Sequence, residues 1–318
     1  MSLKHRQLLL ITFLFLIGIG GGYELYPHMH PASQFTEVRA NDPTLHFTNP
    51  LLFYKSQPDS RYDSLKSDLS SYIATAKSKG DVTDVSVYYR DMNTGEWTGI
   101  DENTPYEPAS MLKVTMMIAY LKGSVDHPDV LTKQLYYKPL AEGEYYESQD
   151  VVPEGYYSAN KLIDLMITYS DNDALVALEA GDQNRTADVF KAFELPLPTA
   201  TTTDFMSARN YSRVFRVLYD STYLPWDVSE EALALLSQTK FTQGIVSGVP
   251  EGTVVSHKFG ERTLLDSAGA IKHRELHDCG IVYKPGKPYF ICVMTKGSDF
   301  PKLLKVISDI STLTYKEN

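Results

Sequence analysis

Strand patterns at both ends of the chain constrain the fold more than any other feature of the sequence. Val82–Asp91 alternates apolar and polar residues, and a turn at Asn93–Gly95 leads into a second short strand, Glu96–Ile100. Three further segments rich in β-branched or aromatic residues follow near the end of the chain, at Thr253–Phe259, Cys279–Tyr283 and Tyr289–Thr295. Because a strand buries its apolar face only within a sheet, we expect the strands from the two ends to meet in one antiparallel sheet.

Helical patterns fill the rest of the chain from residue 60 onward. Tyr62–Lys79 repeats apolar residues at helical spacing, and a last helix is predicted from Phe300 to about Leu313. Six more helices are predicted between them, at Ser110–Lys122, Ser158–Tyr169, Asn172–Glu179, Thr186–Phe193, Ser207–Tyr219 and Ser229–Leu236. The predicted fold class is α/β (α+β), an antiparallel sheet flanked by terminal helices plus an all-helical lobe. A ligand is expected in the crevice between sheet edge and lobe.

The composition excludes several classes of protein. The 318 residues are 43% hydrophobic and 22% charged, as in an ordinary globular protein, which excludes a collagen-like, low-complexity or wholly disordered chain. The net charge of −10 makes the chain a poor ligand for polyanions, so no nucleic-acid partner is expected. Two cysteines are too few for a disulfide scaffold or a four-thiolate zinc site, and no metal or cofactor is predicted.

The N-terminus carries the pattern of an export signal. Basic residues at Lys4 and Arg6 precede an apolar run, Leu8–Ile19, and no small-x-small cleavage site follows clearly. We therefore interpret residues 1–22 as a signal anchor or signal peptide, with an uncleaved anchor favoured, and residues 23–59 as an extracytoplasmic tether. The localisation predicted is extracytoplasmic, membrane-anchored or secreted, with the membrane as a partner through the N-terminal segment.

A serine and a lysine three residues apart, Ser110 and Lys113, lie on one face at the start of a predicted helix. The helix dipole there favours developing negative charge, and burial of the lysine in its apolar stretch would lower its pKa and let it act as a base. This pair provides a nucleophile beside its activating group. The same spacing occurs twice more, beginning at Ser158 and at Ser237, so the spacing alone is a weak signal.

Two later motifs distinguish the first pair. Ser170-Asp171-Asn172 follows a predicted helix and occurs once, and Lys258-Phe259-Gly260 ends a predicted strand. Ser-x-x-Lys, Ser-Asp-Asn and a Lys-x-Gly strand in this order resemble the penicillin-recognising serine hydrolases, in particular the class A β-lactamase group. The resemblance covers roughly residues 60 to 315, and residues 60–318 are accordingly interpreted as a serine β-lactamase-like catalytic domain.

The resemblance implies a role for each matching side chain. Ser110 corresponds to the nucleophile that becomes acylated, and Lys113 corresponds to its activating base. Ser170 corresponds to the proton shuttle to the leaving nitrogen, and Asn172 to the amide that holds both the substrate carbonyl and the first lysine. Lys258 stands where the family keeps a cation for the substrate carboxylate and for the proton path through the second serine.

The resemblance also implies how the backbone contributes. Gly260 would allow close approach of the strand to the ligand. The oxyanion hole would consist of the backbone N–H groups of Ser110 and Glu261, the latter on an edge strand. The expected substrate is a small molecule or a peptidoglycan peptide.

The loop after the Ser-Asp-Asn helix departs from the family pattern. Efficient class A enzymes carry a Glu there that positions water for deacylation, but Phe193–Arg209 is short and lacks the expected Glu-x-x-Leu-Asn. Glu194 is either a helix-end surface charge or a base, with the surface charge favoured. Asp204 is either a turn or N-cap-like residue or a base, with the turn residue favoured. Without a loop Glu, an acyl-enzyme would form and then persist.

A second departure concerns the substrate carboxylate. Phe259 stands where the family usually has Thr or Ser, and a phenylalanine cannot donate a hydrogen bond to that carboxylate. Arg262 or Thr263 could substitute for the missing hydroxyl. This departure favours a choice of substrate that differs from ordinary penicillins.

Three functions remain open on this reading. The first is a serine hydrolase resembling class A β-lactamases, which acylates with a β-lactam or a D-Ala-D-Ala-like amide and deacylates slowly. The second is a penicillin-binding-type D,D-carboxypeptidase or transpeptidase, which the missing loop Glu favours. The third is a non-catalytic cell-envelope binding protein, which the joint presence of all three motifs disfavours.

Histidines, cysteines and tyrosines complete the set of candidates. His273 and His277 flank Glu275, which could suggest zinc binding. The order of these residues is not that of the His-Glu-x-x-His zinc motif, and they precede a predicted strand, so surface or strand-edge histidines are favoured over a metal site. His257 either tunes the site or packs within its strand. The turn at Pro285-Gly286 sets the two cysteines opposite one another, where two buried free thiols are favoured over a disulfide. Four tyrosines either line the mouth of the cleft or pack in the lobe, with packing favoured: Tyr145, Tyr146, Tyr156 and Tyr157.

Overall fold

The computed structural model describes residues 60–139, 145–146, 152–182, 185–198 and 203–318, which belong to one unit, residues 41–318. The predicted signal or anchor at 1–22, the predicted tether at 23–59 and part of the shortened loop, 199–202, lie outside the described residues. Among the described helices, none has the length and apolar character needed to cross a membrane.

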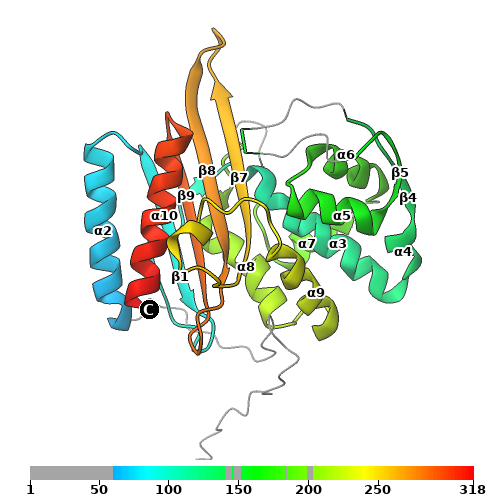
Figure 1. The fold of residues 1–318 in the computed structure, drawn as a ribbon, viewed down its shortest axis with the longest axis horizontal. Coiled ribbons are helices and arrows are strands. Elements are labelled where there is room, and N and C mark those ends of the chain that lie inside the picture. Colours follow the sequence, from blue (N-terminus) through cyan, green and yellow to red (C-terminus); the bar gives the residue numbers. More distant parts are fainter. Residues whose placement is uncertain (1–59, 140–144, 147–151, 183–184, 199–202) are drawn as a thin grey trace, which may run out of the picture. The chain divides into compact units, whose positions relative to one another are not determined.

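Five strands form one antiparallel sheet in the order β2-β1-β9-β8-β7. Their bounds are β1 Asp84–Asp91, β2 Trp97–Ile100, β7 Val255–Leu265, β8 Ile271–Val282 and β9 Tyr289–Gly297. Strands from the two ends of the chain therefore meet as predicted, because β1 pairs along its whole length with β9. This order leaves β7 at an edge of the sheet, next to the helical lobe (Figure 1).

The first and last long helices cover one face of the sheet. These are α2, Asp63–Ser78, and α10, Phe300–Glu317, which lie side by side in Figure 1. The apolar stripe Leu65, Leu69, Ile73 and Ala76 of α2 is buried, as helical spacing predicts for a helix with one apolar face. Alternate strand residues face these helices and complete one of two hydrophobic cores.

A helical lobe lies on the other side of the sheet and shares the second core with it. Its described helices are α3 Lys113–Asp126, α4 Asp129–Thr132, α5 Ala159–Thr168, α6 Asn172–Gly181, α7 Arg185–Ala192, α8 Ala208–Tyr219 and α9 Trp226–Leu236. Short 3₁₀ turns are η1 Ser60–Tyr62, η2 Ala109–Leu112 and η3 Val246–Gly248. The α+β class predicted from the sequence, with terminal helices on the sheet and a helical lobe, is thus confirmed.

Some strands differ from the prediction. The hairpin of β7 and β8 continues to Leu265 and resumes at Ile271, well beyond the predicted strand ends. Its outer half is largely exposed and shows no alternation of buried apolar and exposed polar residues. The Asp266 carboxylate closes the turn by accepting from two backbone N–H groups. Two short pairs, too brief for periodicity to indicate, were not predicted: β3 Pro105–Tyr106 with β6 Met206–Ser207, and β4 Gln134–Tyr137 with β5 Gly155–Ser158.

The two cysteines lie directly opposite each other on neighbouring strands. Cys279 of β8 pairs with Cys292 of β9, as counting outward from the Pro285-Gly286 turn predicts. The two sulfur atoms form a disulfide, so the preference for free thiols is wrong. Residues directly opposite across an antiparallel pair have their Cβ atoms close together, which is what allows these sulfurs to join.

Candidate active site

Ser110 lies in η2, the 3₁₀ turn that leads directly into α3. Residues three apart in a 3₁₀ turn share a face, so its side chain lies on the same side as Lys113, the first residue of α3. The preceding Ala109 has φ 47°, a left-handed conformation that costs energy for a residue with a Cβ. The surrounding structure holds it there, since the hydroxyl of Tyr211 donates to the carbonyl of Met111 at 2.8 Å.

Lys113 is buried and its ammonium reaches the Ser-Asp-Asn segment. Its Nζ donates to the Ser170 carbonyl at 2.5 Å, to Ser170 Oγ at 3.2 Å and to Asn172 Oδ1 at 2.7 Å. These contacts link α3 to the turn between α5 and α6. Ser170 and Asn172 follow Lys113 by 57 and 59 residues in the sequence. The structure therefore brings three of the predicted site residues together.

Ser170 is the point at which two lysines converge. Its Oγ accepts from Lys258 Nζ at 2.9 Å as well as from Lys113. Its φ of 59° is the second left-handed conformation at this site. A hydroxyl oxygen that accepts from two amines keeps its own hydrogen for donation, which is what a proton shuttle requires.

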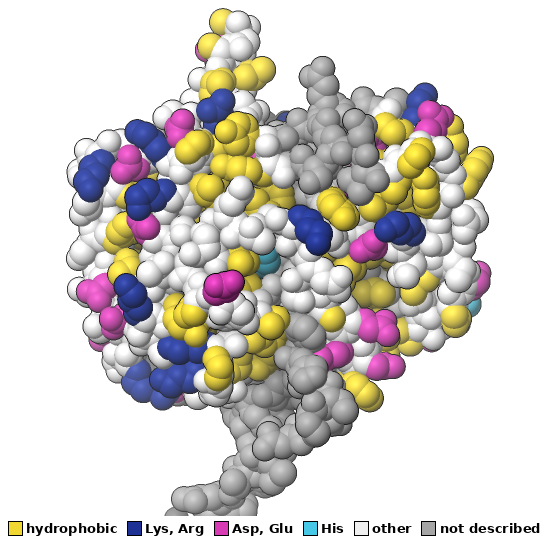
Figure 2. Space-filling model, in the orientation of Figure 1, with side chains coloured by type: hydrophobic (Ala, Val, Ile, Leu, Met, Phe, Trp, Pro, Cys, Tyr) yellow, Lys and Arg dark blue, Asp and Glu magenta, His cyan; other side chains and the backbone are white. Residues whose placement is uncertain are grey.

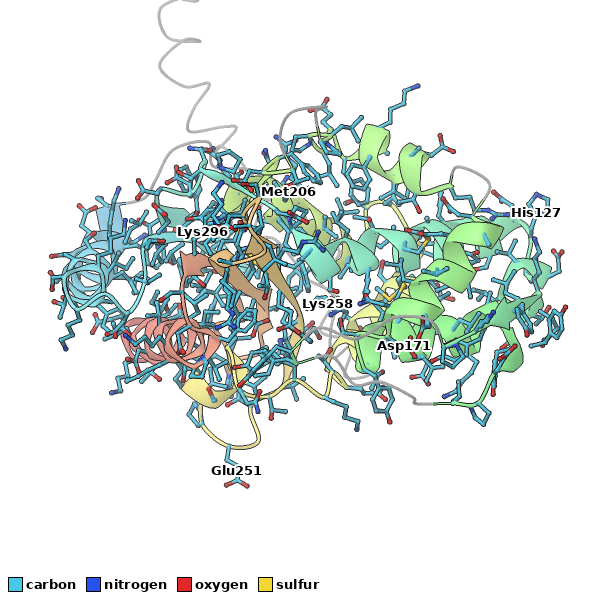
Figure 3. The ribbon with its side chains drawn as sticks, turned by 90° about the horizontal axis from the view of Figure 1, so that it is seen from above. His127, Asp171, Met206, Glu251, Lys258 and Lys296 are labelled. Carbon is cyan, nitrogen blue, oxygen red and sulfur yellow. A yellow bond between two sulfur atoms is a disulfide. The ribbon has the colours of Figure 1, made fainter. Side chains whose placement is uncertain are left out.

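Lys258 lies on β7 and is 0% exposed. Besides the hydroxyl of Ser170, its ammonium donates to the Phe259 carbonyl at 3.0 Å. Figure 3 shows Lys258 and Asp171 close to each other where the edge of the sheet meets the helical lobe. The sheet and the lobe thus contribute opposite halves of one polar cluster.

Asp171 anchors the motif between the serine and the asparagine. Its Oδ1 caps α6 by accepting from the Ala174 N–H at 2.9 Å, and its Oδ2 accepts from the Tyr137 hydroxyl at 3.0 Å. Ser170 and Asn172 are therefore held on either side of a fixed carboxylate. No role was assigned to Asp171 from the sequence, although an aspartate just before a predicted helix is a signal for an N-cap.

Gly260 lets β7 pass close to the serine turn. A Cβ added there would lie 2.5 Å from the Pro108 carbonyl oxygen and 3.2 Å from the Met111 nitrogen. The strand therefore lies against the backbone around Ser110 at this glycine, whereas the close approach predicted for Gly260 was to the ligand and stays a prediction. The neighbouring Glu261 is buried, and its Oε1 accepts from the Tyr146 N–H at 2.6 Å.

The Phe259 ring borders this cluster. The ammonium of Lys258 lies 4.2 Å from the centre of the ring. This ring is 2% exposed and stacks on Phe241 with the ring centroids 4.1 Å apart. Of the two predicted substitutes for a hydroxyl, Arg262 has its Nε 3.4 Å from an oxygen of Glu107, just ahead of the serine turn.

Among the described residues, no contact joins Glu194 or Asp204, the two acids of the shortened loop, to Ser110. Glu194 is exposed just past the end of α7. Asp204 contacts Lys296 of β9 at 2.5 Å. The N-cap of α8 is Ser207, whose hydroxyl accepts from the Asn210 N–H at 3.1 Å, so the N-cap-like role considered for Asp204 belongs to this serine.

His277 and Glu275 form a buried pair beneath the serine turn. His277 Nδ1 accepts from the Thr295 N–H at 3.1 Å, so the ring hydrogen is on Nε2, which donates to the Glu107 carbonyl at 3.0 Å. The expectation of surface or strand-edge histidines is wrong for His277, because β8 is an interior strand and this side chain is fully buried. His273 is partly exposed and contacts the same carboxylate at 3.1 Å.

The Glu275 carboxylate stays ionised despite its burial. Burial opposes ionisation, but the hydrogen bond from His277 and the ammonium of Lys296, 3.1 Å away, outweigh it and lower the pKa of Glu275 to about 2. Lys296 bridges this carboxylate to Asp204. The loop before α8 and the strand under the serine turn are therefore joined by one ion-pair network.

The remaining candidates have local structural roles. Ser158 caps α5, and the Ser237 hydroxyl donates to a carbonyl of α9, which accounts for the two other serine–lysine spacings. His257 packs in its strand against Asp278 at 2.8 Å. Among the four tyrosines, Tyr146 packs on Phe241 and Phe300, Tyr145 packs on Phe300, Tyr157 on Tyr137, and Tyr156 is exposed beside Tyr136.

The model of the beta-lactamase enzyme family matches residues 64–317 of this chain. The chain belongs to that family. The match spans the sheet, the lobe and every residue of the polar cluster, so the β-lactamase-like resemblance of the three motifs is confirmed. As a family member, the chain is a hydrolase of the serine β-lactamase and penicillin-binding type. A comparison with curated proteins found no match.

Solved structures show the same fold. The chain is similar to PBP-A, at 19% identity over 83% of this chain and 98% of that one, with a TM-score of 0.68. It is similar to a variant of PBP-A solved as an acyl-enzyme complex with penicillin G, at 18% identity over 82% and 98% of the two chains, with the same TM-score of 0.68. A beta-lactamase from Chitinophaga pinensis is 17% identical over 80% and 98%, with a TM-score of 0.67.

Proposed function

We propose that this protein forms an acyl-enzyme on Ser110 with β-lactams or D-Ala-D-Ala-like amides and releases the acyl group slowly. The observation that carries the proposal is the convergence of Lys113 and Lys258 on the hydroxyl of Ser170, next to the turn that bears the nucleophile. A buried lysine beside a serine and a shared hydroxyl are the groups that proton transfer to and from an amide requires.

The acylation step assigns one task to each group. Ser110 Oγ attacks the carbonyl carbon and its proton passes to Lys113 Nζ in the neutral form. The tetrahedral oxyanion accepts from the backbone N–H groups of Ser110 and Glu261. When the carbon–nitrogen bond breaks, Ser170 donates its hydrogen to the leaving nitrogen and recovers one from an adjacent lysine. The product is an ester on Ser110, which water must cleave to complete turnover.

Slow release of the acyl group is supported by the acids of the loop before α8. Efficient deacylation needs a base that activates water beside the ester. Glu194 is exposed beyond α7, and Asp204 is held in an ion pair with Lys296 of β9. Neither acid takes the role of the missing loop Glu, which positions water for deacylation. The same observation favours the second candidate, a penicillin-binding-type D,D-carboxypeptidase or transpeptidase, over an efficient antibiotic-degrading enzyme.

The proposed site of action is outside the cytoplasm, with the N-terminal segment as anchor and a peptidoglycan peptide as the natural substrate. The Cys279–Cys292 disulfide supports this location, because disulfides persist in oxidising compartments. A non-catalytic binding protein is the less favoured reading, since such a protein would not need two buried lysines on one serine.

The experiment that tests the proposal follows the intact mass of the full chain after penicillin is added. We expect an adduct that persists for much longer than it takes to form, and no adduct with Ser110→Ala. A short-lived adduct with continuous release of penicilloic acid would contradict slow deacylation. No adduct at all would contradict acylation by this serine.

A further inference from the structure

A buried histidine contacts the segment of chain that leads into the serine turn. His277 comes from β8, an interior strand of the sheet, and its side chain is fully buried. Its Nε2 donates to the backbone carbonyl of Glu107 at 3.0 Å, three residues before Ser110. The proposed acylation step gives this side chain no task, although it joins the sheet to the chain beside the nucleophile.

The neighbours of the ring fix its orientation. The backbone N–H of Thr295 donates to Nδ1 at 3.1 Å, which places the ring hydrogen on Nε2. Both groups that face Nε2 are acceptors, namely the Glu107 carbonyl and, at 3.2 Å, the carboxylate of Glu275. The ring also packs edge-on against Tyr106, with the ring centroids 5.4 Å apart. His277 therefore directs its single ring hydrogen to the serine segment and the carboxylate beside it.

The ionised carboxylate of Glu275 keeps the ring from turning away. Its other oxygen lies 3.1 Å from the ammonium of Lys296, which also forms an ion pair with Asp204. A charge that is fully buried is strongly destabilised when it loses a partner. The carboxylate therefore holds the ring of His277 on one side, while the N–H of Thr295 holds it on the other.

The chain between Glu107 and Ser110 has little freedom of its own. Pro108 has φ −70°, which its ring fixes, and its carbonyl accepts from the Met111 N–H at 3.1 Å. Ala109 has φ 47°, within the small left-handed region open to a residue with a Cβ. The directions of the serine hydroxyl and of its backbone N–H therefore depend on where the carbonyl of Glu107 is held.

The serine turn is thus held from both sides. His277 fixes the carbonyl before it, and the Tyr211 hydroxyl fixes the carbonyl of Met111 after it, at 2.8 Å. Little histidine surface is visible on the face that Figure 2 shows, whereas charged side chains are spread over it. Because His277 is fully buried, solvent is not at hand to replace its hydrogen bond when the donor is removed.

We infer that His277 is a positioning residue for the nucleophile, which it orients through the carbonyl of Glu107. This role rests on the proposed acylation of Ser110. A displacement of a reacting group by about 1 Å can cost on the order of 100-fold in rate. Loss of the donor should therefore slow the acylation step, and it should leave reversible binding of the substrate unchanged, because a fully buried ring does not touch the substrate.

The test measures acylation of the full chain by a fluorescent penicillin in a stopped-flow instrument, over a range of penicillin concentrations. The limiting rate reports the acylation step, and the half-saturating concentration reports reversible binding. His277→Met and His277→Gln introduce side chains of equal length, of which only glutamine ends in an N–H donor. We expect a limiting rate about tenfold or more lower in His277→Met, a half-saturating concentration within about twofold of the wild type, and recovery of most of the lost rate in His277→Gln.

A second donor-free variant covers the case in which His277→Met does not fold. The oxygen of the asparagine in His277→Asn can still accept from the Thr295 N–H, but its amide is too short to reach Glu107, so this variant should be as slow as His277→Met. His273→Met is the control, because His273 contacts the same carboxylate at 3.1 Å from a partly exposed position, and it should acylate like the wild type.

The limiting rates decide the outcome. Equal rates in His277→Gln and the donor-free variants would overturn the inference, as would a loss confined to the half-saturating concentration or an equal loss in His273→Met. A wild-type chain that forms no adduct would instead refute the proposed function, and the role of His277 in acylation with it.

Discussion

Ser170 and its two lysine partners determine what the site can do at the scale of single residues. The serine is held in a left-handed conformation by Asp171, which caps the next helix, and its oxygen accepts from both amines. Strain of this kind persists only where surrounding contacts overdetermine the backbone. The geometry therefore exists before any substrate binds, which is the condition for rapid proton transfer.

Phe259→Thr restores the hydroxyl that the family usually carries at this position, but it removes a buried ring that contacts Phe241 and the ammonium of Lys258. Because both contacts are lost, we expect the free energy of unfolding to fall by about 3 kcal/mol and the acylation rate not to rise. Leu265→Thr is the control, since it makes a similar change at an exposed position of the same strand and should cost less than about 0.5 kcal/mol. A faster acylation without loss of stability, measured by denaturant unfolding and a fluorescent penicillin, would contradict this placement.

Glu275 makes the stability of the fold depend on pH. Its pKa is about 2 in the folded chain and 4.5 as a free side chain, so the ionised form stabilises the fold above pH 4.5. That contribution, on the order of 3 kcal/mol, is lost as the pH falls from about 5 to 2. The difference in unfolding free energy between wild type and Glu275→Gln should therefore be large at pH 7 and shrink towards pH 2.

Urea unfolding at several pH values measures this difference. Glu179→Gln on α6 replaces an exposed carboxylate and should cost less than about 0.5 kcal/mol at pH 7. A difference between wild type and Glu275→Gln that stays constant from pH 7 to 2 would show that the carboxylate is not held ionised by its partners.

The sequence indicated the polar cluster but not what supports it. Lys113, Ser170, Asn172 and Lys258 come together as the three motifs predict. The contact from Tyr211 to the serine turn spans 100 residues, and that from His277 to Glu107 spans 170. No local pattern encodes such contacts, because they depend on which elements the fold places side by side.

At the scale of elements, the contact between β7 and the serine turn sets the position of the nucleophile. The strand approaches the turn so closely at Gly260 that the nearest obstacle to a side chain is a backbone atom, the Pro108 carbonyl oxygen, 2.5 Å from where a Cβ would lie. Backbone cannot rotate away as a flexible side chain can. Any Cβ at this position must therefore move the strand or the turn.

Gly260→Ala should slow acylation by about 100-fold, because displacing the turn misplaces Ser110 relative to its partners. The rate is measured with a fluorescent penicillin on protein whose fold is verified by circular dichroism. Gly155→Ala is the matched control, because its Cβ would meet only the Tyr157 ring at 3.7 Å, an ordinary contact. Equal rates for Gly260→Ala and the wild type would refute this role of the glycine.

Prediction of elements from sequence succeeded where residues are buried and failed where they are exposed. The stripe of α2 gave a clear helical period, and the inner parts of the long strands, buried on both faces, gave apolar runs, so these elements were found. The outer part of the β7–β8 hairpin is exposed, and its pairing depends on backbone hydrogen bonds that no side-chain pattern reports. The two-residue strands β3 and β6 are too short to show a period.

At the scale of the whole molecule, strands from early and late parts of the chain pair in one sheet. The helices of the lobe come between these two groups of strands in the sequence. The disulfide joins β8 to β9 within that sheet, next in register to Lys258 on β7. Its position was predictable by counting from a turn, but its oxidation was not, because the pairing of two thiols depends on compartment as well as distance.

Removal of the disulfide should destabilise the molecule as a whole. Cys279→Ala/Cys292→Ala opens a link across a sequence separation of 13 residues, so we expect a loss of about 3 kcal/mol in the free energy of unfolding. Thermal or denaturant unfolding measures the loss, and reduction of the wild-type chain should reproduce it. A double variant as stable as the oxidised wild type would show that the link adds nothing to the fold.

Locating the penicilloyl group in the chain is the most direct test of the central claim, that the two lobes build one acylation site around a single serine. The full-length protein is treated with penicillin, digested, and its peptides are sequenced by mass spectrometry. We expect the modified side chain to be that of Ser110. Modification of Ser170 instead, or modification of Ser110 that survives in a Lys113→Ala/Lys258→Ala variant at an unchanged rate, would contradict it.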